Sequence, residues 1–203
     1  MKQLRPQQQL QQRERSPQNQ MQKHNSKKTA VKDSGQPQKS SISIRRFNSG
    51  EEAEILRLIN DIMSSEFGND SSAYPTQDLE ELTQSYGELG EGFFVALDGD
   101  KIIGTVGIKK EDERIALLRR LFVSSPYRRR KIGLELIEHA LKFCHEVGYN
   151  EVIFKTTSTM TSAIELCKSR GFVQRAKLEL GPIELLKFSI SIRNGLNSVA
   201  ASE

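Results

Sequence analysis

Residues 117–133 read LLRRLFVSSPYRRRKIG, and this stretch decides the fold. The apolar residues up to Val123 are typical of a mostly buried strand, and Pro126 ends it because proline has no N–H for a strand ladder. Four cations follow at residues 128–131, and Gly133 lies where a helix begins. From there apolar residues recur at a period of 3.6, which predicts an amphipathic helix. They are Ile132, Leu136, Ile137, Ala140, Leu141 and Cys144.

The turn between this strand and this helix has the chemistry of an anion site. The first N–H groups of a helix have no intrahelical acceptor, and they carry the positive end of the helix dipole. Arg128 to Lys131 add side-chain charge at the same point. The stretch therefore predicts a phosphate-bearing ligand, such as a pyrophosphate, at the helix start.

This order of strand, cationic turn and helix resembles the acetyl-CoA loop of the GNAT N-acetyltransferase superfamily. That loop reads Arg or Gln, two residues, Gly, one residue, then Gly or Ala. Arg128 and Gly133 match it, whereas Lys131 stands at the first glycine.

A second motif supports the resemblance. Residues 163–172 read AIELCKSRGF and begin 30 residues after Gly133. They resemble the family's ending Ala-x-x-Leu-Tyr-x-x-x-Gly-Phe, with Cys167 at the tyrosine position. The resemblance covers residues 41–192 and leaves the first 40 residues outside.

Charge is unevenly distributed along the 203 residues. The net charge is +4, but residues 1–40 hold 9 Lys or Arg and 2 Asp or Glu, a net of +7, so the remainder carries −3. No apolar run is long enough to span a bilayer, so no membrane segment is expected. The two cysteines form no disulfide framework and the three histidines have no ligand spacing, which predicts a reducing compartment and no metal site.

Residues 1–40 are predicted to be a disordered, basic tail. They contain 11 glutamines and few aliphatic residues, too few to offset the entropy of ordering. A solvated linker is the favoured interpretation, and an organelle transit peptide is the alternative because the tail bears Arg and few acids. The domain is expected at residues 41–192 with a frayed end at 193–203, and the expected location is the cytoplasm.

The remaining pattern predicts a mixed α/β (α+β) fold. A strand–helix–strand crossover after residue 117 places two strands in parallel, and the other strands pair through short turns. We expect a mostly antiparallel sheet of about six or seven strands around this central pair, with about four helices on both faces. Strands are expected at 41–47, 92–97, 101–109, 117–123, 151–156, 172–174 and 182–192, and helices from near 51, at 78–89, from 132 and at 162–169.

The resemblance implies a splayed pair of central strands with acetyl-CoA between them. The backbones of Phe122 and Val123 would contact pantetheine, and the turn would hold the pyrophosphate. The residues of that turn are Arg128, Arg129, Arg130, Lys131, Ile132 and Gly133. Lys131 either strains a position that needs positive φ or lies in the first helical turn, and the second is favoured.

The acid and the base of the reaction are less defined. Many family members use the tyrosine at position 167 to protonate the leaving thiolate. Cys167 is the candidate catalytic residue here, as a relay through water, as a packing residue or as an acyl carrier, of which packing is favoured. No base is assigned; the candidate carboxylates are Glu66, Asp70, Glu111, Asp112 and Glu113.

The first functional hypothesis is an acetyl-CoA-dependent N-acetyltransferase that acts on a primary amine in a ternary complex, without a metal. A non-catalytic acyl-CoA-binding regulatory module is the alternative. A nucleic-acid-binding role for the basic tail ranks last, because the tail has no aromatic residues to stack on bases. A homodimer is compatible with the sequence.

Overall fold

The computed structural model describes residues 42–192, which form seven strands and five α-helices. The tail of residues 1–40 and the end at 193–203 lie outside the described residues, so their expected states stay predictions. The strands are β1 (Ile42–Arg46), β2 (Gly92–Asp98), β3 (Lys101–Lys110), β4 (Ile115–Val123), β5 (Glu151–Thr157), β6 (Val173–Leu180) and β7 (Ile183–Ser191). The α-helices are α1 (Glu52–Glu66), α2 (Gln77–Glu80), α3 (Leu82–Ser85), α4 (Ile132–Val147) and α5 (Thr161–Ser169). Two 3-10 helices, η1 (Gly68–Ala73) and η2 (Ser125–Tyr127), complete the fold.

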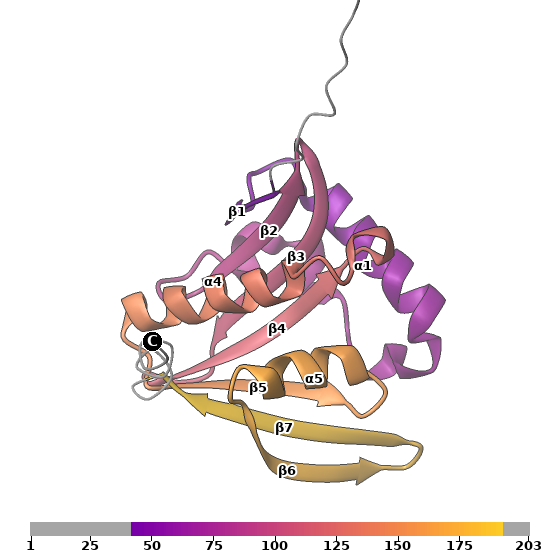
Figure 1. The fold of residues 1–203 in the computed structure, drawn as a ribbon, viewed down its shortest axis with the longest axis vertical. Coiled ribbons are helices and arrows are strands. Elements are labelled where there is room, and N and C mark those ends of the chain that lie inside the picture. The colour runs from indigo at the N-terminus through magenta and orange to yellow at the C-terminus, as the bar shows by residue number, and fades with distance from the viewer. Residues whose placement is uncertain (1–41, 193–203) are drawn as a thin grey trace, which may run out of the picture. The chain divides into compact units, whose positions relative to one another are not determined.

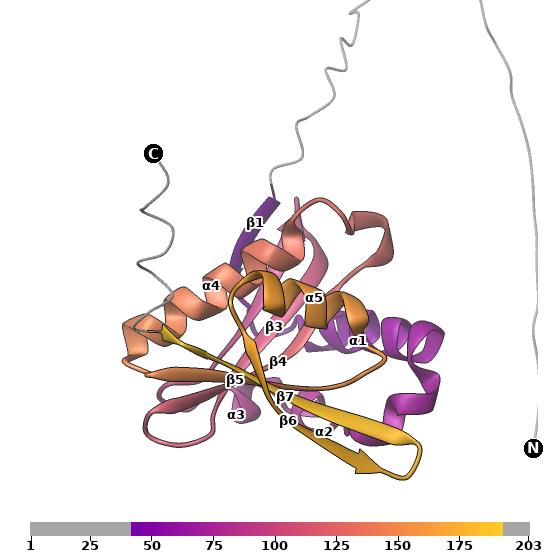
Figure 2. The ribbon, with the colours of Figure 1, turned by 60° about the horizontal axis from the view of Figure 1, so that its bottom comes forward.

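All seven strands belong to one sheet in the order β1-β2-β3-β4-β5-β7-β6 (Figure 1). Only the β4–β5 pair among them is parallel, and α4 makes the crossover between these strands. The β6–β7 hairpin forms one edge of the sheet, with α5 lying across β5 (Figure 2). The predicted mixed, mostly antiparallel fold is confirmed.

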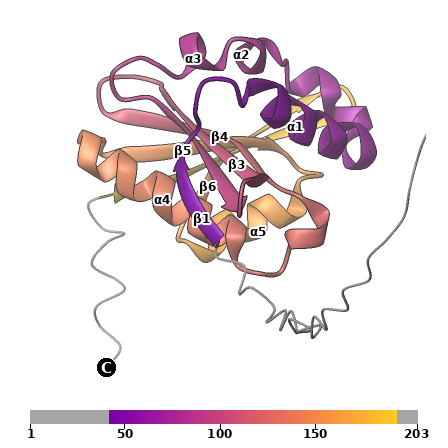
Figure 3. The ribbon, with the colours of Figure 1, turned by 90° about the horizontal axis from the view of Figure 1, so that it is seen from above.

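Helices cover both faces of the sheet, as Figure 3 shows from above. On one face α4 and α5 pack through residues such as Leu136 and Ile164, and on the other α1, α2 and α3 pack through residues such as Ile59. The strand β2 contributes to both cores, with Phe94 facing α4 and Phe93 facing α1. Burial on both faces explains the continuous apolar run in its sequence.

The structure differs from the sequence prediction in three segments. The expected loop at 67–76 contains η1, and the expected helix at 78–89 is two short helices separated at Glu81, whose φ and ψ of −129° and 58° are not helical. The expected short strand at 172–174 extends to Leu180 as β6. Residues 176–180 read AKLEL and alternate apolar and polar residues, so the signal for the longer strand was present in the sequence.

The helices α1 and α5 begin without a side-chain cap hydrogen bond, although threonines lie near the start of α5. The hydroxyl of Thr159 donates to Asp70 instead. This contact becomes important for the site.

Two features are absent from the described residues. No helix within 42–192 is long and apolar enough to cross a membrane. The same part of the chain contains no group of three or more His, Cys, Asp or Glu side chains placed to bind a metal ion.

Candidate active site

The central strands separate midway along their length. Pairing between β4 and β5 ends at Leu118 and Phe154. Beyond that point β4 stays paired with β3 as far as Val123, and β5 stays paired with β7 as far as Thr157. Backbone groups of residues 119–123 on the β5 side are therefore left without a strand partner, and such groups are suited to an extended ligand that carries amides.

Two cavities meet at this gap. The loop-side cavity, of about 700 Å³, is lined by residues of the anion loop, which we define as residues 124–133. The sheet-side cavity, of about 550 Å³, lies among β4, β5 and the β6–β7 hairpin. The two cavities share the lining residues Leu121, Phe122, Met160 and Ala163. A group held at Phe122 would thus be reachable from both sides.

The anion loop has a strained backbone. Arg129 and Lys131 have φ angles of 61° and 65°, in the left-handed region, and Lys131 precedes α4 directly. The favoured interpretation, in which Lys131 lies in the first helical turn, is wrong. A side chain in this region costs about 1–2 kcal/mol, which explains the family's glycine at this position.

The amides at the start of α4 point out of the helix. The first intrahelical bond runs from the Glu135 N–H to the Lys131 carbonyl at 3.0 Å, so the amides of residues 132–134 have no intrahelical acceptor. Left-handed residues alternating with ordinary ones also turn successive N–H groups toward one side, which forms an anion-binding nest. Gly133 lets Leu166 of α5 approach closely, since an added Cβ would lie 2.8 Å from its Cδ2.

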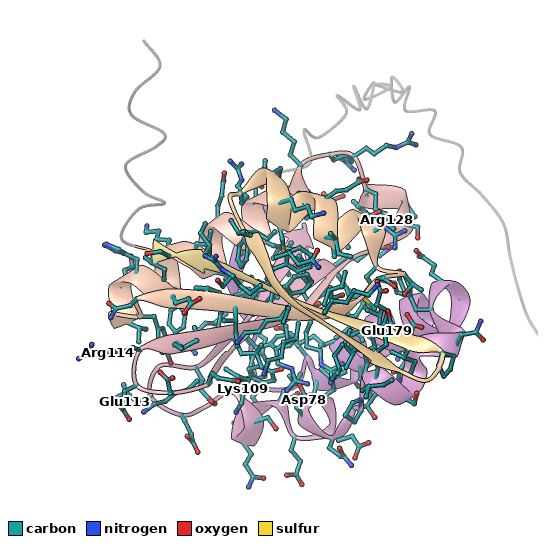
Figure 4. The ribbon with its side chains drawn as sticks, turned by 90° about the horizontal axis from the view of Figure 1, so that it is seen from below. Asp78, Lys109, Glu113, Arg114, Arg128 and Glu179 are labelled. Atoms are coloured by element: carbon teal, nitrogen blue, oxygen red, sulfur yellow. The ribbon has the colours of Figure 1, made fainter. Side chains whose placement is uncertain are left out.

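Arg128 lies in the wall of the loop-side cavity and is already paired. Its guanidinium donates to both oxygens of Glu66 at 2.7 Å, and its Nε donates to the Val123 carbonyl at 3.0 Å. Figure 4 shows Arg128 on the side of the molecule where α1 lies. The hydrogen bonds from Arg128 hold the pKa of Glu66 below its usual range. Glu66, a candidate base, is therefore weakly basic.

Further cations lie against Tyr127, which lines this cavity. The Arg130 guanidinium carbon lies 5.4 Å from the ring centroid, and the Lys101 ammonium lies 5.6 Å from it. These distances are typical of cation–π contacts. The ring holds positive charge beside the anion loop.

Cys167 does not reach either cavity. Its side chain is fully buried in the core between α5 and the sheet, and burial raises the pKa of its thiol to about 12. The preceding residue, Leu166, lines the loop-side cavity. This geometry favours the packing interpretation of Cys167 over a proton relay or an acyl carrier, although its catalytic role stays untested.

The acidic turn before β4 lies at the wrong end of that strand. Glu111 pairs with Lys155 at 2.8 Å, Glu113 pairs with Lys110 at 2.6 Å, and Asp112 accepts the backbone N–H of Arg114 at 2.7 Å. None of these carboxylates lines either cavity.

Asp70 differs from the other candidate carboxylates, because η1 places it against the end of β5. Its carboxylate accepts hydrogen bonds from Thr157 and Thr159. Nothing in the local sequence of η1 indicates this contact, since 87 positions separate Asp70 from Thr157.

A second buried network was not predicted from the sequence. Arg120 has a φ of 56° and forms a β-bulge, in which it and Leu121 face the single residue Val106 of β3. Its guanidinium donates to Asp78 of α2, whose carboxylate also accepts the Tyr86 hydroxyl at 2.6 Å. Two successive arginines in a buried strand interrupt the alternation and are the signal that could have located this bulge.

Electrostatics in this network favour the ionised carboxylate. Burial alone raises the pKa of Asp78, but hydrogen bonds from Arg120 and Tyr86 outweigh it, and the pKa lies below its usual range. Burial and the neighbouring Asp78 raise the pKa of Tyr86. In Figure 4 Asp78 lies well apart from Arg128, so this network belongs to a different part of the site.

Comparison with known proteins agrees with this geometry. The sequence pattern of the acetyltransferase (GNAT) family matches residues 56–172, and the chain belongs to this family. The resemblance inferred from the anion loop is confirmed.

Curated relatives are N-acetyltransferases. Human N-acetyltransferase 8 is 38% identical over 101 residues, which cover 47% of this chain and 44% of the relative. The probable N-acetyltransferase camello of Xenopus tropicalis is 30% identical over 123 residues, which cover 58% of this chain and 55% of the relative. The chain thus matches about half the length of these relatives.

Solved structures share the fold. An acetyltransferase of the GNAT family from Staphylococcus aureus Mu50 has a TM-score of 0.66 at 23% identity, covering 75% of this chain and 99% of that one. A putative acetyltransferase from Salmonella typhimurium, solved with its cofactor acetyl-CoA, has a TM-score of 0.62 at 16% identity. The match covers 74% of this chain and 94% of that one.

Proposed function

We propose that this protein is an acetyl-CoA-dependent N-acetyltransferase that transfers an acetyl group directly to a primary amine in a ternary complex. One observation carries the proposal: the β4–β5 gap joins two cavities at Phe122, and the cationic anion loop lines one of them. The family membership supports acetyl transfer in general terms.

The residues of the loop-side cavity fit acetyl-CoA. Unpaired amides of residues 132–134 and the left-handed residues Arg129 and Lys131 would hold the pyrophosphate. The backbone of Phe122 and Val123 would hold the pantetheine amides in the gap. Acetyl-CoA supplies an activated thioester, and a strand N–H near Val123 would stabilise negative charge on its carbonyl oxygen.

The sheet-side cavity would receive the acceptor amine. Its wall is mainly apolar, and its charged lining residues are Arg119, Arg120, Lys155 and Lys187, with no Asp or Glu in the lining. A polycationic amine would meet repulsion there, whereas an amine on an apolar body, with or without a carboxylate, is compatible with this wall. Holding this amine against the thioester supplies much of the catalysis.

The test is a thiol-release assay with acetyl-CoA and a panel of amines. We expect turnover with phenethylamine or L-phenylalanine and much less with spermidine. Absence of thiol release with every amine of a panel that also includes peptides would contradict the enzyme proposal.

A non-catalytic acyl-CoA-binding module is the second candidate, and the buried Cys167 at the usual acid position favours it. Calorimetry distinguishes the two: a binding module gives a heat of acetyl-CoA binding without turnover. The cytoplasmic location and a homodimer stay predictions.

A further inference from the structure

A buried carboxylate lies between the two cavities and lines neither of them. Asp70 is 7% exposed. It accepts a hydrogen bond from the Thr157 hydroxyl at 2.7 Å and a second one from the Thr159 hydroxyl. The two threonine oxygens lie 2.9 Å apart. All three groups therefore form one hydrogen-bonded cluster at the end of β5.

The cluster reaches both cavities through side chains that line them. On one side the Tyr74 hydroxyl lies 3.2 Å from Thr157 Oγ1, and Tyr74 lines the sheet-side cavity. On the other side Thr159 lines the loop-side cavity. Asp70 thus connects through Thr157 and Tyr74 to the place proposed for the amine. It connects through Thr159 to the place proposed for the thioester.

The hydrogen-bond directions define an ordered chain. An ionised carboxylate only accepts, so both threonine hydroxyls donate to Asp70. Thr157 Oγ1 can then accept from Tyr74. The Tyr74 oxygen also accepts the Thr157 backbone N–H at 2.8 Å, which fixes the ring at the cavity wall. Thr156 Oγ1 also lies 3.1 Å from the Tyr74 oxygen, but its hydroxyl donates to the Thr157 carbonyl at 3.4 Å. With the Thr156 hydroxyl in that direction, one lone pair of the tyrosine oxygen remains for a proton from the cavity.

We propose that Tyr74, Thr157, Asp70 and Thr159 form a proton relay that carries the amine proton to the leaving thiolate; this inference rests on the proposed function. As the C–N bond forms, the nitrogen gives a proton to Tyr74, Tyr74 gives its own to Thr157, and Thr157 gives its own to Asp70. As the C–S bond breaks, Asp70 returns a proton to Thr159, which gives its own to the sulfur. One N–H bond is exchanged for one S–H bond, and the carboxylate is restored.

The relay supplies a proton acceptor for the amine and a proton donor for the thiolate, roles for which Glu66 and Cys167 are poorly placed. Glu66 is held in an ion pair with Arg128, and Cys167 is buried away from both cavities. Tyr74 and Thr159 would contact the reactants and are the catalytic residues of this scheme. Thr157 and Asp70 act through them, as positioning and proton-holding residues.

The principal test is Thr157→Val, which keeps the side-chain shape and removes the central hydroxyl. The single-turnover rate with phenethylamine or L-phenylalanine, whichever the wild-type protein acetylates, should fall on the order of 10²-fold, the usual size of a lost acid–base contribution. The KM for acetyl-CoA should stay within about threefold, since the anion loop is untouched.

A proton inventory in mixtures of light and heavy water separates chemistry from structure. A plot of the wild-type single-turnover rate against the deuterium fraction of the solvent should be a bowed curve, because several protons move together. For Thr157→Val the curve should become linear. A variant that keeps both the wild-type rate and the bowed curve would overturn the relay.

A second variant and a matched control guard against misfolding. Tyr74→Phe removes one oxygen and should give the same loss of rate and of curvature. Thr83→Val removes a hydroxyl that also donates to a carboxylate, that of Glu52 at 3.4 Å, but lines neither cavity, and it should behave as wild type. If the wild-type protein acetylates an amine and Tyr74→Phe does so at the same rate, the relay is contradicted and the proposed function stands. If the wild-type protein acetylates no amine, the proposed function is contradicted, and the relay with it.

Discussion

The loop-side and sheet-side halves of this site are built in different ways. The loop-side half comes from one continuous stretch, residues 124–133, in which a strand end, four cations and a helix start follow one another. The sheet-side half is assembled from side chains that are distant in sequence, such as Asp70 with Thr157 and Asp78 with Arg120. Ligand binding depends on local backbone geometry in the first half, and on buried tertiary contacts in the second.

The comparison predicts that the largest effect on stability comes from the sheet-side half. Asp78→Ala leaves the guanidinium of Arg120, which is 2% exposed, without its carboxylate. Breaking a buried pair by removing one partner costs about 3–5 kcal/mol, so the free energy of unfolding in urea should fall by about 3 kcal/mol.

Its matched control is Glu113→Ala, which removes an exposed partner of Lys110. The control should leave the urea midpoint unchanged. Equal midpoints for both variants would show that the Asp78–Arg120 pair does not stabilise the sheet-side half.

The largest effect on the loop side is expected for Arg128→Ala. The variant loses the bond to the Val123 carbonyl and leaves Glu66 unpaired beside the pyrophosphate site. The KM for acetyl-CoA should rise on the order of tenfold, equivalent to about 1.4 kcal/mol, with a smaller change in kcat.

A double variant tests this reason. Arg128→Ala combined with Glu66→Ala should recover part of the loss, because the unpaired carboxylate is gone. Lys142→Ala, at a distant exposed pair on α4, should have no effect on the KM. If the double variant has the same KM for acetyl-CoA as Arg128→Ala, repulsion between Glu66 and the pyrophosphate is unimportant.

A smaller effect is expected at the strained residue Lys131. Lys131→Gly relieves about 1–2 kcal/mol of backbone strain at a φ of 65° and costs about 0.5–1 kcal/mol in chain entropy, so stability should rise by about 0.5–1 kcal/mol. Lys131→Ala removes the same charge and keeps the strain. Both variants should bind acetyl-CoA equally weakly in calorimetry, whereas only the glycine variant should gain thermal stability.

The same contrast explains what the sequence could predict. The strand, the anion loop and α4 follow from local patterns, because burial, proline and helical periodicity act on neighbouring residues. The left-handed Lys131 was missed because a lysine fits a first helical turn equally well by pattern. The contacts of Asp70 and Asp78 were missed because only the tertiary fold brings α2 and η1 to the ends of β4 and β5, and a carboxylate among polar residues looks exposed.

The smallest expected effect on catalysis concerns Cys167. Its thiol is buried and its pKa is raised to about 12, so at neutral pH it stays protonated and lines neither cavity. Cys167→Ala should therefore leave kcat unchanged, while the small void it creates should cost about 1 kcal/mol of unfolding free energy. A large loss of kcat with normal acetyl-CoA binding would instead place the acid of the reaction at Cys167. The thiolate would then take its proton from Cys167 and not from Thr159, so Thr159→Val, which interrupts the proposed relay, should have no effect on kcat.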